Sequence, residues 1–243
     1  MSDAVINPEA LADTPTGPQK KQQRNIRLTI LVIVVFITVV MALFLNKITT
    51  PRVLSNVELR VNGTFVFDQP RIFKDFNLLD QNGEVFNLES LKGHWSLLFF
   101  GYTSCPDVCP STLAVMRDMK SKMRSDEIAE QIQIALVTVD PARDTVEALK
   151  PYMNYFDPEF IGATGEFLEI KRLANQLNMA FVKVPLQRAS LPDGGYLVDH
   201  SANIALINPM GHYHGFIKAP LDEARMRLTL ASIISRFEMP EEG

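Results

Sequence analysis

An uninterrupted run of uncharged, mostly apolar side chains from Leu28 to Leu45 constrains this chain more than any other feature of its sequence. A helix rises about 1.5 Å per residue, so roughly 20 residues span a hydrocarbon core about 30 Å thick. A cleaved signal peptide is the alternative. However, the run and the leader before it are both long for one, and no small-residue cleavage pattern follows. The sequence therefore predicts one transmembrane anchor at residues 26–46.

The flanks of this run predict its orientation. Its N-terminal side carries Lys20, Lys21, Arg24 and Arg27, and its C-terminal side carries Lys47 and Arg52. Because the more basic flank stays in the cytoplasm, residues 1–25 are expected to form a cytoplasmic tail. The leader is not Arg-rich and acid-poor, as a mitochondrial transit peptide would be. We therefore expect a single-pass protein of a bacterial inner membrane with its soluble domain in the periplasm.

Beyond the anchor, predicted strands and helices alternate. Residues 47–70 show little periodicity apart from a short strand at Thr64–Phe67, and they are predicted to form a tether to a domain at 71–243. In that domain the patterns predict strands at Phe76–Leu79, Val85–Asn87, Trp95–Phe100, Ile132–Val139, Ala180–Val184, Ser201–Ile207 and His212–Ile217, and helices at 111–123, 144–155, 165–177 and 221–237. This alternation is typical of an α/β sheet with helices on both faces.

Turn signals separate these elements. Asn82-Gly83 suits the positive φ angles of a tight hairpin turn, so an N-terminal hairpin is predicted there. Asp193–Gly195 is expected to form another turn. Asp144 and Glu147 have the spacing of a capping box, which predicts that Asp144 is the N-cap of a helix, and Asp140 is interpreted as a strand-end residue.

The net charge of −4 limits the partners that this chain can have. A mildly acidic domain lacks the basic surface that nucleic acid requires, so no nucleic-acid partner is expected. The predicted partners are the membrane, through one helix, and whatever binds at the cysteines.

The two cysteines of the chain, Cys105 and Cys109, lie four residues apart between a predicted buried strand and a predicted helix. If the helix begins near Cys105, both thiols lie on one helical face, with Cβ atoms about 5–6 Å apart. The helix N-terminus would lower their pKa values, whereas Asp107 would oppose a second anion and favour a bound cation. A thiol pair at such a junction is typical of a reactive or a metal-binding site.

A soft cation fits two thiolates, and copper and zinc are the candidates. Structural zinc normally has four protein ligands, and the chain offers no third cysteine. His200 precedes a predicted core strand after a turn-rich loop, and in such a sheet that loop can lie beside the first strand-to-helix junction. Cys105, Cys109 and His200 would make a three-coordinate site with one open position, which suits Cu(I) and tolerates Cu(II).

Other interpretations of these residues stay open. The cysteines could form a structural disulfide in an oxidising compartment, although so short a loop gains little entropic stabilisation. His200 could be a turn residue or a hydrogen-bonded core histidine. His212 and His214 lie on one face of a predicted strand as a candidate metal pair, but an edge strand facing solvent is the simpler interpretation. His94 is expected in a surface turn.

Several stretches together resemble the Sco/SenC family of membrane-anchored copper chaperones. They are Phe99–Pro110, which contains Cys-Pro-x-x-Cys-Pro, then Val137–Thr145, which contains Asp-Pro-x-Arg-Asp, and finally Asp199-His200-Ser201. The similarity runs from about Phe73 to Phe237. It implies a thioredoxin-like fold with an added N-terminal hairpin and a copper site at Cys105, Cys109 and His200, the positions that match the family's two cysteines and late histidine.

The resemblance also implies a function and partners. The chain would take copper from an upstream donor and deliver it to the copper-binding subunit of cytochrome c oxidase, during assembly of the dinuclear copper centre. The alternative is a thiol–disulfide reductase that keeps the copper-ligand cysteines of the oxidase reduced, with Cys105 and Cys109 as catalytic residues. A peroxidase on a related fold is a weaker alternative, because the expected Thr-x-x-Cys arrangement is absent.

Overall fold

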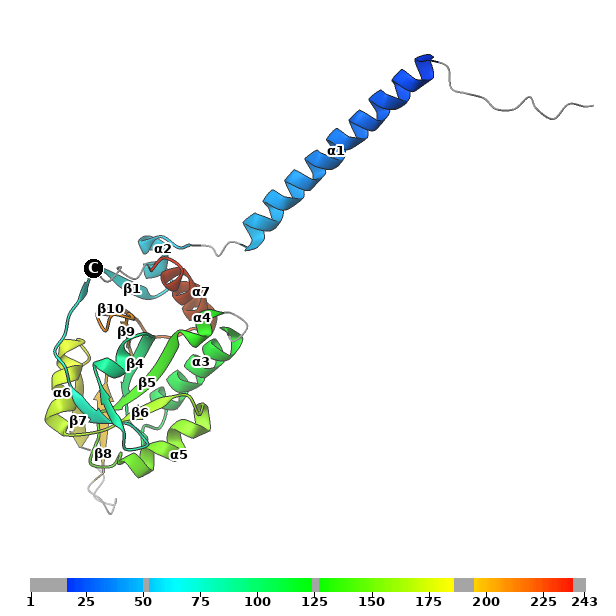
Figure 1. Cartoon of the computed structure of the whole chain (residues 1–243). Coiled ribbons are helices and arrows are strands. Elements are labelled where there is room, and N and C mark those ends of the chain that lie inside the picture. Colours follow the sequence, from blue (N-terminus) through cyan, green and yellow to red (C-terminus); the bar gives the residue numbers. More distant parts are fainter. Residues whose placement is uncertain (1–16, 50–52, 124–126, 186–194, 238–243) are drawn as a thin grey trace, which may run out of the picture. The chain divides into compact units, whose positions relative to one another are not determined.

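A computed structural model describes residues 17–49, 53–123, 127–185 and 195–237 of the chain (Figure 1). The chain divides into two compact units, Met1–Pro51 and Arg52–Gly243. Because their relative placement is not determined, each unit is described by itself.

The first unit consists of one long helix, α1, at Gly17–Thr49. Residues Asn25–Leu45 form a stretch long and apolar enough to cross a membrane, with a mean hydropathy of 3.2. The predicted anchor at 26–46 therefore lies inside the helix. Of the predicted cytoplasmic tail at 1–25, residues 17–25 are helical and continuous with the apolar stretch, while residues 1–16 lie outside the described residues.

The second unit is built on a mixed sheet, which among the described residues has the strand order β1-β10-β9-β4-β5-β6. Strand β4 runs parallel to β5 and antiparallel to β9. All seven residues of β4 are buried, since both faces of this strand are covered. The strands of this sheet are β1 Thr64–Arg71, β4 Trp95–Gly101, β5 Ile132–Thr138, β6 Ile161–Ala163, β9 Ile204–Ile207 and β10 Tyr213–Ile217.

Helices cover both faces of the sheet, as the alternation of elements predicts. Figure 1 shows α3 and α7 on one side of the sheet and α6 on the other. The helices of this unit are α2 Asn56–Val61, the short 3-10 turn η1 Glu89–Leu91, α3 Val108–Met123, α4 Glu127–Glu130, α5 Val146–Phe156, α6 Phe167–Gln176 and α7 Glu223–Ile234. The expected α/β class is therefore confirmed.

The predicted N-terminal hairpin is present as β2 (Asn77–Leu79) and β3 (Val85–Asn87). Its turn depends on Gly83, whose φ angle of 81° is one that side-chain-bearing residues rarely adopt. Asp80 completes the turn, because its Oδ1 accepts hydrogen bonds from the amides of Asn82 and Glu84.

The prediction that residues 47–70 form a tether is wrong for most of that segment. Leu54 and Leu59 are buried in the core, and β1 is a full edge strand of the central sheet rather than a short isolated one. The segment was difficult to predict because α2 is short and its burial depends on distant residues. For example, the Leu54 amide donates to Ser232 Oγ of α7 at 2.6 Å.

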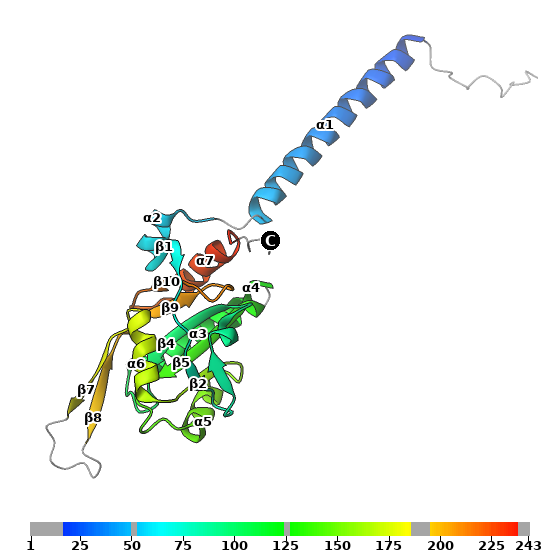
Figure 2. The ribbon, with the colours of Figure 1, turned by 60° about the vertical axis from the view of Figure 1, so that its left-hand side comes forward.

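The region around His200 also differs from the prediction. Residues Tyr196–His200 form a strand, β8, that pairs antiparallel with β7 (Phe181–Pro185), and together they extend away from the central sheet (Figure 2). The next core strand begins at Ile204 rather than Ser201. The turn predicted at Asp193–Gly195 falls mostly outside the described residues.

The burial of Leu59 places part of the predicted tether, residues 47–70, inside the domain, and this assignment can be tested. Replacing a buried leucine by alanine removes its packing and leaves a cavity, so Leu59→Ala should lower the free energy of unfolding by about 2–5 kcal/mol. Val57, on the same helix but 71% exposed, provides the control, and Val57→Ala should change it by less than about 0.5 kcal/mol. Urea unfolding of both variants measures the difference, and equal effects would contradict the assignment.

Candidate metal centre

The pairing of β4 with β9 brings the cysteine loop and His200 together. Phe99 near the end of β4 lies opposite Ile204 at the start of β9. Because the two strands are antiparallel, the residues that follow β4 lie beside those that precede β9. Cys105 and Cys109 follow β4, and His200 precedes β9. Segments almost 100 residues apart in sequence therefore meet at one edge of the sheet.

The three side chains predicted as ligands converge. The Sγ of Cys109 lies 3.3 Å from Nε2 of His200, and the Sγ of Cys105 lies 4.0 Å from the same nitrogen. All three ligand atoms lie within 4.8 Å of one another. Three ligands placed around one ion at typical zinc–sulfur and zinc–nitrogen lengths would lie about 3.7–4.0 Å apart. An ion therefore fits after shifts of less than about 1 Å.

The cysteines converge by a different route from the predicted one. Helix α3 begins at Val108, so Cys105 lies in the preceding turn and not on the helix. Its Sγ nevertheless accepts a hydrogen bond from the Cys109 amide at 3.4 Å. Amides of the first helical turn have no partner within the helix. The Cys105 sulfur supplies an acceptor for the Cys109 amide and is thereby held at the start of α3, next to Cys109.

The carboxylate of Asp144 holds the loop that carries the cysteines. Its fully buried carboxylate accepts hydrogen bonds from the amide and hydroxyl of Thr103, at 3.0 and 2.6 Å, and from the hydroxyl of Thr138 at 2.6 Å. The predicted N-cap role of Asp144 is wrong, because Thr145 caps α5 instead. A buried carboxylate requires such donors, so this residue ties the loop after β4 to the end of β5.

Two aromatic rings and a carbonyl orient His200. The rings of Phe99 and Tyr102 make edge-to-face contacts with the His200 ring, at centroid distances of 5.7 and 5.8 Å. Its Nδ1 lies 3.2 Å from the carbonyl oxygen of Ser201. A carbonyl only accepts hydrogen bonds, so Nδ1 carries the proton and Nε2 of the neutral ring presents a lone pair to the sulfurs. Burial lowers the pKa of His200 and favours this neutral form.

Burial dominates the electrostatics of Cys109 as well. The residue is fully buried, and this raises the pKa of its thiol. The prediction that the pKa of this thiol is lowered is wrong for Cys109, because loss of solvation outweighs the lowering effect of its hydrogen bond with the Tyr102 backbone. A bound cation would therefore have to displace the proton of Cys109. Gly101 permits this close packing, since a Cβ at that position would lie 2.9 Å from the Cys109 sulfur.

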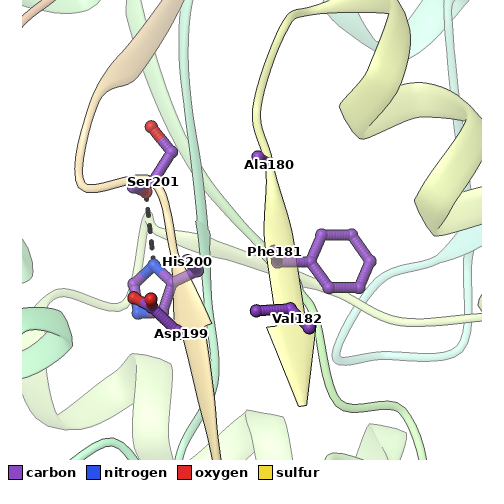
Figure 3. Close-up of a pocket in the computed structure, with 6 residues that line it drawn as sticks. All are labelled: Ala180, Phe181, Val182, Asp199, His200 and Ser201. Carbon is purple, nitrogen blue, oxygen red and sulfur yellow. Dashed lines mark hydrogen bonds between the residues drawn. The ribbon is translucent and has the colours of Figure 1, made fainter. Parts of the chain in front are cut away.

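His200 is accessible to an incoming molecule through a pocket. It lines a pocket of about 310 Å³ with Ala180, Phe181, Val182, Asp199 and Ser201 (Figure 3). Cys105 is also partly exposed, whereas Cys109 is not. Two of the three candidate ligands are thus accessible to an incoming molecule.

Comparison with known proteins places the chain in a family. Residues 67–235 match the sequence model of SCO1/SenC. The chain belongs to the SCO1/SenC family. A protein from Stutzerimonas stutzeri is 40% identical over 179 residues, which cover 74% of this chain and 85% of that protein.

Solved structures of SCO1/SenC proteins share the fold of this chain. The structure of Bradyrhizobium japonicum ScoI with copper bound is 34% identical, has a TM-score of 0.58, and matches 66% of this chain and 98% of that one. The structure of yeast Sco1 with copper bound is 29% identical, has a TM-score of 0.63, and matches 71% and 92% of the two chains. The expected thioredoxin-like fold is therefore confirmed for this SCO1/SenC protein.

Sequence analysis missed the supporting residues of this SCO1/SenC site. Asp144, Tyr102 and Phe99 each contact a candidate ligand or its loop, but none was assigned a role in the site. The available signal was the pair of aspartates around Pro141, directly after a buried strand. Carboxylates at that position are either solvated or enclosed by donors, and the sequence did not decide between these arrangements.

The remaining histidines lie apart from the three ligands. Among the described residues, the only cluster with metal-ligand spacing is Cys105, Cys109 and His200. His94 is exposed, as predicted. The interpretation of His214 as part of a solvated edge strand is wrong, because β1 covers β10. Its ring packs against Trp95 and Phe237, and its Nδ1 is buried with no hydrogen-bond partner among the described residues.

The partly buried His214 predicts a pH dependence of stability. Burial lowers its pKa to about 4 in the folded protein, against about 6.5 in an unfolded chain. The unfolded state therefore binds more protons between these values, so stability is full above pH 6.5 and falls as the pH drops toward 4. His214→Phe should lose less stability than the wild type between pH 7 and pH 4 in urea unfolding.

His94→Gln is the matched control for this measurement. It removes an exposed imidazole and should leave the wild-type pH dependence unchanged. Parallel stability curves for the wild type and His214→Phe would contradict the assignment.

Proposed function

We propose that this chain is a membrane-anchored copper chaperone that binds one copper through Cys105, Cys109 and His200 and delivers it to the dinuclear copper centre of cytochrome c oxidase during assembly. The observation that carries the proposal is the convergence of two sulfurs and an unprotonated Nε2 within 4.8 Å. These donors come from two separate parts of the fold, and the neutral tautomer of His200 is fixed by the carbonyl of Ser201.

The donor set favours copper over zinc as the cargo. Soft thiolates select Cu(I), which accepts three ligands, whereas structural zinc sites normally have four. No fourth histidine, cysteine or carboxylate joins this group among the described residues. With two thiolates and a neutral imidazole, the net charge is −1 for Cu(I) and 0 for Cu(II), so the site tolerates both states. The copper-bound structures of two family members support this choice.

The accessibility of the site supports delivery rather than permanent storage. Cys105 and His200 are partly exposed, and His200 lines an open pocket. A ligand of a partner can therefore reach the ion before the ligands of this chain dissociate. The proposed partners are an upstream copper donor and the copper-binding subunit of the oxidase, and family membership supports the latter.

The proposed location is a bacterial inner membrane, with the soluble domain in the periplasm. The apolar stretch Asn25–Leu45 supports a single span, and the excess of Lys and Arg on its N-terminal side supports a cytoplasmic N-terminus. In an oxidising periplasm two free neighbouring thiols would form a disulfide unless they are kept reduced or metal-bound. Copper loading would protect them.

Loss of any one ligand should weaken copper binding severely. Cys105→Ser, Cys109→Ser and His200→Ala should each lower the affinity for Cu(I) by more than the ~10–100-fold that is typical for loss of a supporting outer-shell group. Competition with a Cu(I) chelator measures the affinity of the reduced full-length protein. His94→Ala, which removes an exposed imidazole, should bind as the wild type does. A His200→Ala variant with unchanged affinity would overturn the proposed ligand set.

The alternative function is a thiol–disulfide reductase that keeps the copper-ligand cysteines of the oxidase reduced. The unequal exposure of the cysteines favours it, since Cys105 could attack a substrate disulfide while the buried Cys109 resolves the intermediate. The burial that raises the pKa of Cys109 would slow its attack as the resolving thiol, because exchange proceeds through the thiolate. Exchange chemistry requires no imidazole at this position, so His200 separates the two functions.

Complementation in cells distinguishes these functions. In a strain that lacks this protein, the wild type should restore the copper content of purified oxidase, whereas His200→Ala and Cys105→Ser should not. If His200→Ala restores the copper content and Cys105→Ser does not, the reductase function is supported instead. An oxidase fully loaded with copper in the absence of this protein would contradict both functions.

A further inference from the structure

The hairpin that carries His200 is attached to the domain by a buried carboxylate, that of Asp140. The Asp140 side chain is 0% exposed. Its Oδ1 accepts a hydrogen bond from the Tyr196 hydroxyl at 2.7 Å and lies 3.3 Å from Lys183 Nζ. Its Oδ2 pairs with the guanidinium of Arg143. Tyr196 and Lys183 belong to β8 and β7, so two of these three partners come from the hairpin.

The same partners also form a stack of cations and rings. The Arg143 guanidinium lies 4.1 Å from the centre of the Tyr196 ring and 5.5 Å from that of Tyr102. Lys183 Nζ lies 4.6 Å from the Tyr196 ring centre. Such contacts are individually modest, but here they share one buried carboxylate. We call Asp140, Arg143, Lys183 and Tyr196 the hairpin clamp.

The clamp acts on the strand face that presents the imidazole. Side chains two residues apart on a strand point to the same face, so Tyr196, Val198 and His200 all face the domain. Val198 is buried, and its amide donates to the Tyr102 hydroxyl at 3.3 Å. Tyr102 in turn packs against His200. Separation of the hairpin from the domain would therefore break the clamp and withdraw His200 from the sulfurs together.

Burial of the Asp140 carboxylate favours the docked position of the hairpin over a lifted one. A buried carboxylate depends on its hydrogen-bond and ion-pair partners, because burial has removed most of its solvation. If the hairpin lifts, Asp140 keeps Arg143 but loses Tyr196 and Lys183. The docked position of β8, and with it the position of Nε2, is therefore the one that satisfies this charge.

The two aspartates of one loop hold the two halves of the ligand set. Asp144 binds the loop that carries the cysteines, and Asp140 binds the hairpin that carries the histidine. The segment between them turns tightly, since the Asp144 amide donates to the Asp140 carbonyl at 3.0 Å. The short segment after β5 that contains both aspartates therefore fixes the distance between the His200 imidazole and the two sulfurs.

We propose that the hairpin clamp positions His200 for copper coordination, and that Tyr196 and Lys183 control how long the copper is retained. Neither residue contacts the three ligand atoms, so they are positioning residues and not ligands. This inference rests on the proposed copper-binding function and deepens it. Release of the clamp would leave copper on two thiolates only and would open a coordination position to a ligand of the recipient.

The test uses Tyr196→Phe, because this change removes the hydroxyl and keeps both the ring and the Asp140–Arg143 pair. Loss of a hydrogen bond to a charged group should speed Cu(I) transfer to a chelator about tenfold. Full-length protein in detergent is used throughout. Tyr155→Phe removes an exposed hydroxyl from α5 and should transfer copper at the wild-type rate. Lys183→Met should resemble Tyr196→Phe, and Lys183→Arg should restore slow transfer.

A double-mutant cycle separates positioning from general destabilisation. If the clamp acts through His200, Tyr196→Phe should have no further effect on copper transfer in a His200→Ala background. An equal acceleration in both backgrounds, or a wild-type rate for Tyr196→Phe alone, would overturn the clamp. If the wild type itself retains no copper, or if His200→Ala retains it normally, the proposed function fails and not only the clamp.

Discussion

The metal site depends on the register between β4 and β9. The cysteines follow the first of these strands and the histidine precedes the second, and the antiparallel pairing of Phe99 with Ile204 brings their ends to the same place. A shift by one residue would turn every side chain of β9 to the opposite face of the sheet. Since all four residues of β9 are buried, such a shift would also disrupt the core, and the core thereby secures the geometry of the site.

Loss of solvation is the second constraint, and it acts differently on each group of the site. It keeps His200 neutral, which suits a ligand, and it keeps the Cys109 thiol protonated until a cation displaces the proton. Asp140 and Asp144 are buried as well, but each is surrounded by donors or cations. The low polarity of these buried positions raises the free-energy cost of an unpaired charge. It also strengthens the hydrogen bonds and ion pairs that each aspartate makes.

Sequence reasoning predicted those parts of the fold that short-range patterns control. The core strands and the hairpin at Gly83 were predicted because apolar runs and turn residues are visible in single segments. His200 lies 95 residues from Cys105, and it was grouped with the cysteines mainly through the family resemblance. The role of α2 and β1, the strand β8 and the contacts of Asp144 were missed. The burial of Leu54 and the role of Asp144 depend on distant partners, Ser232 and Thr103, that no local pattern records. Strand β8 pairs with the nearby β7, but the turn-rich stretch between them does not indicate a strand.

The edges of the central sheet have a consequence for how copies of this domain behave beside one another. At one edge β1 contains Pro70 and an irregular register between Val66 and Arg71, and at the other edge β6 has only three residues. A proline offers no amide hydrogen, and a short or kinked strand makes a poor template for a further strand. Neighbouring molecules crowded onto one surface would thus find little free backbone with which to stack into aggregates.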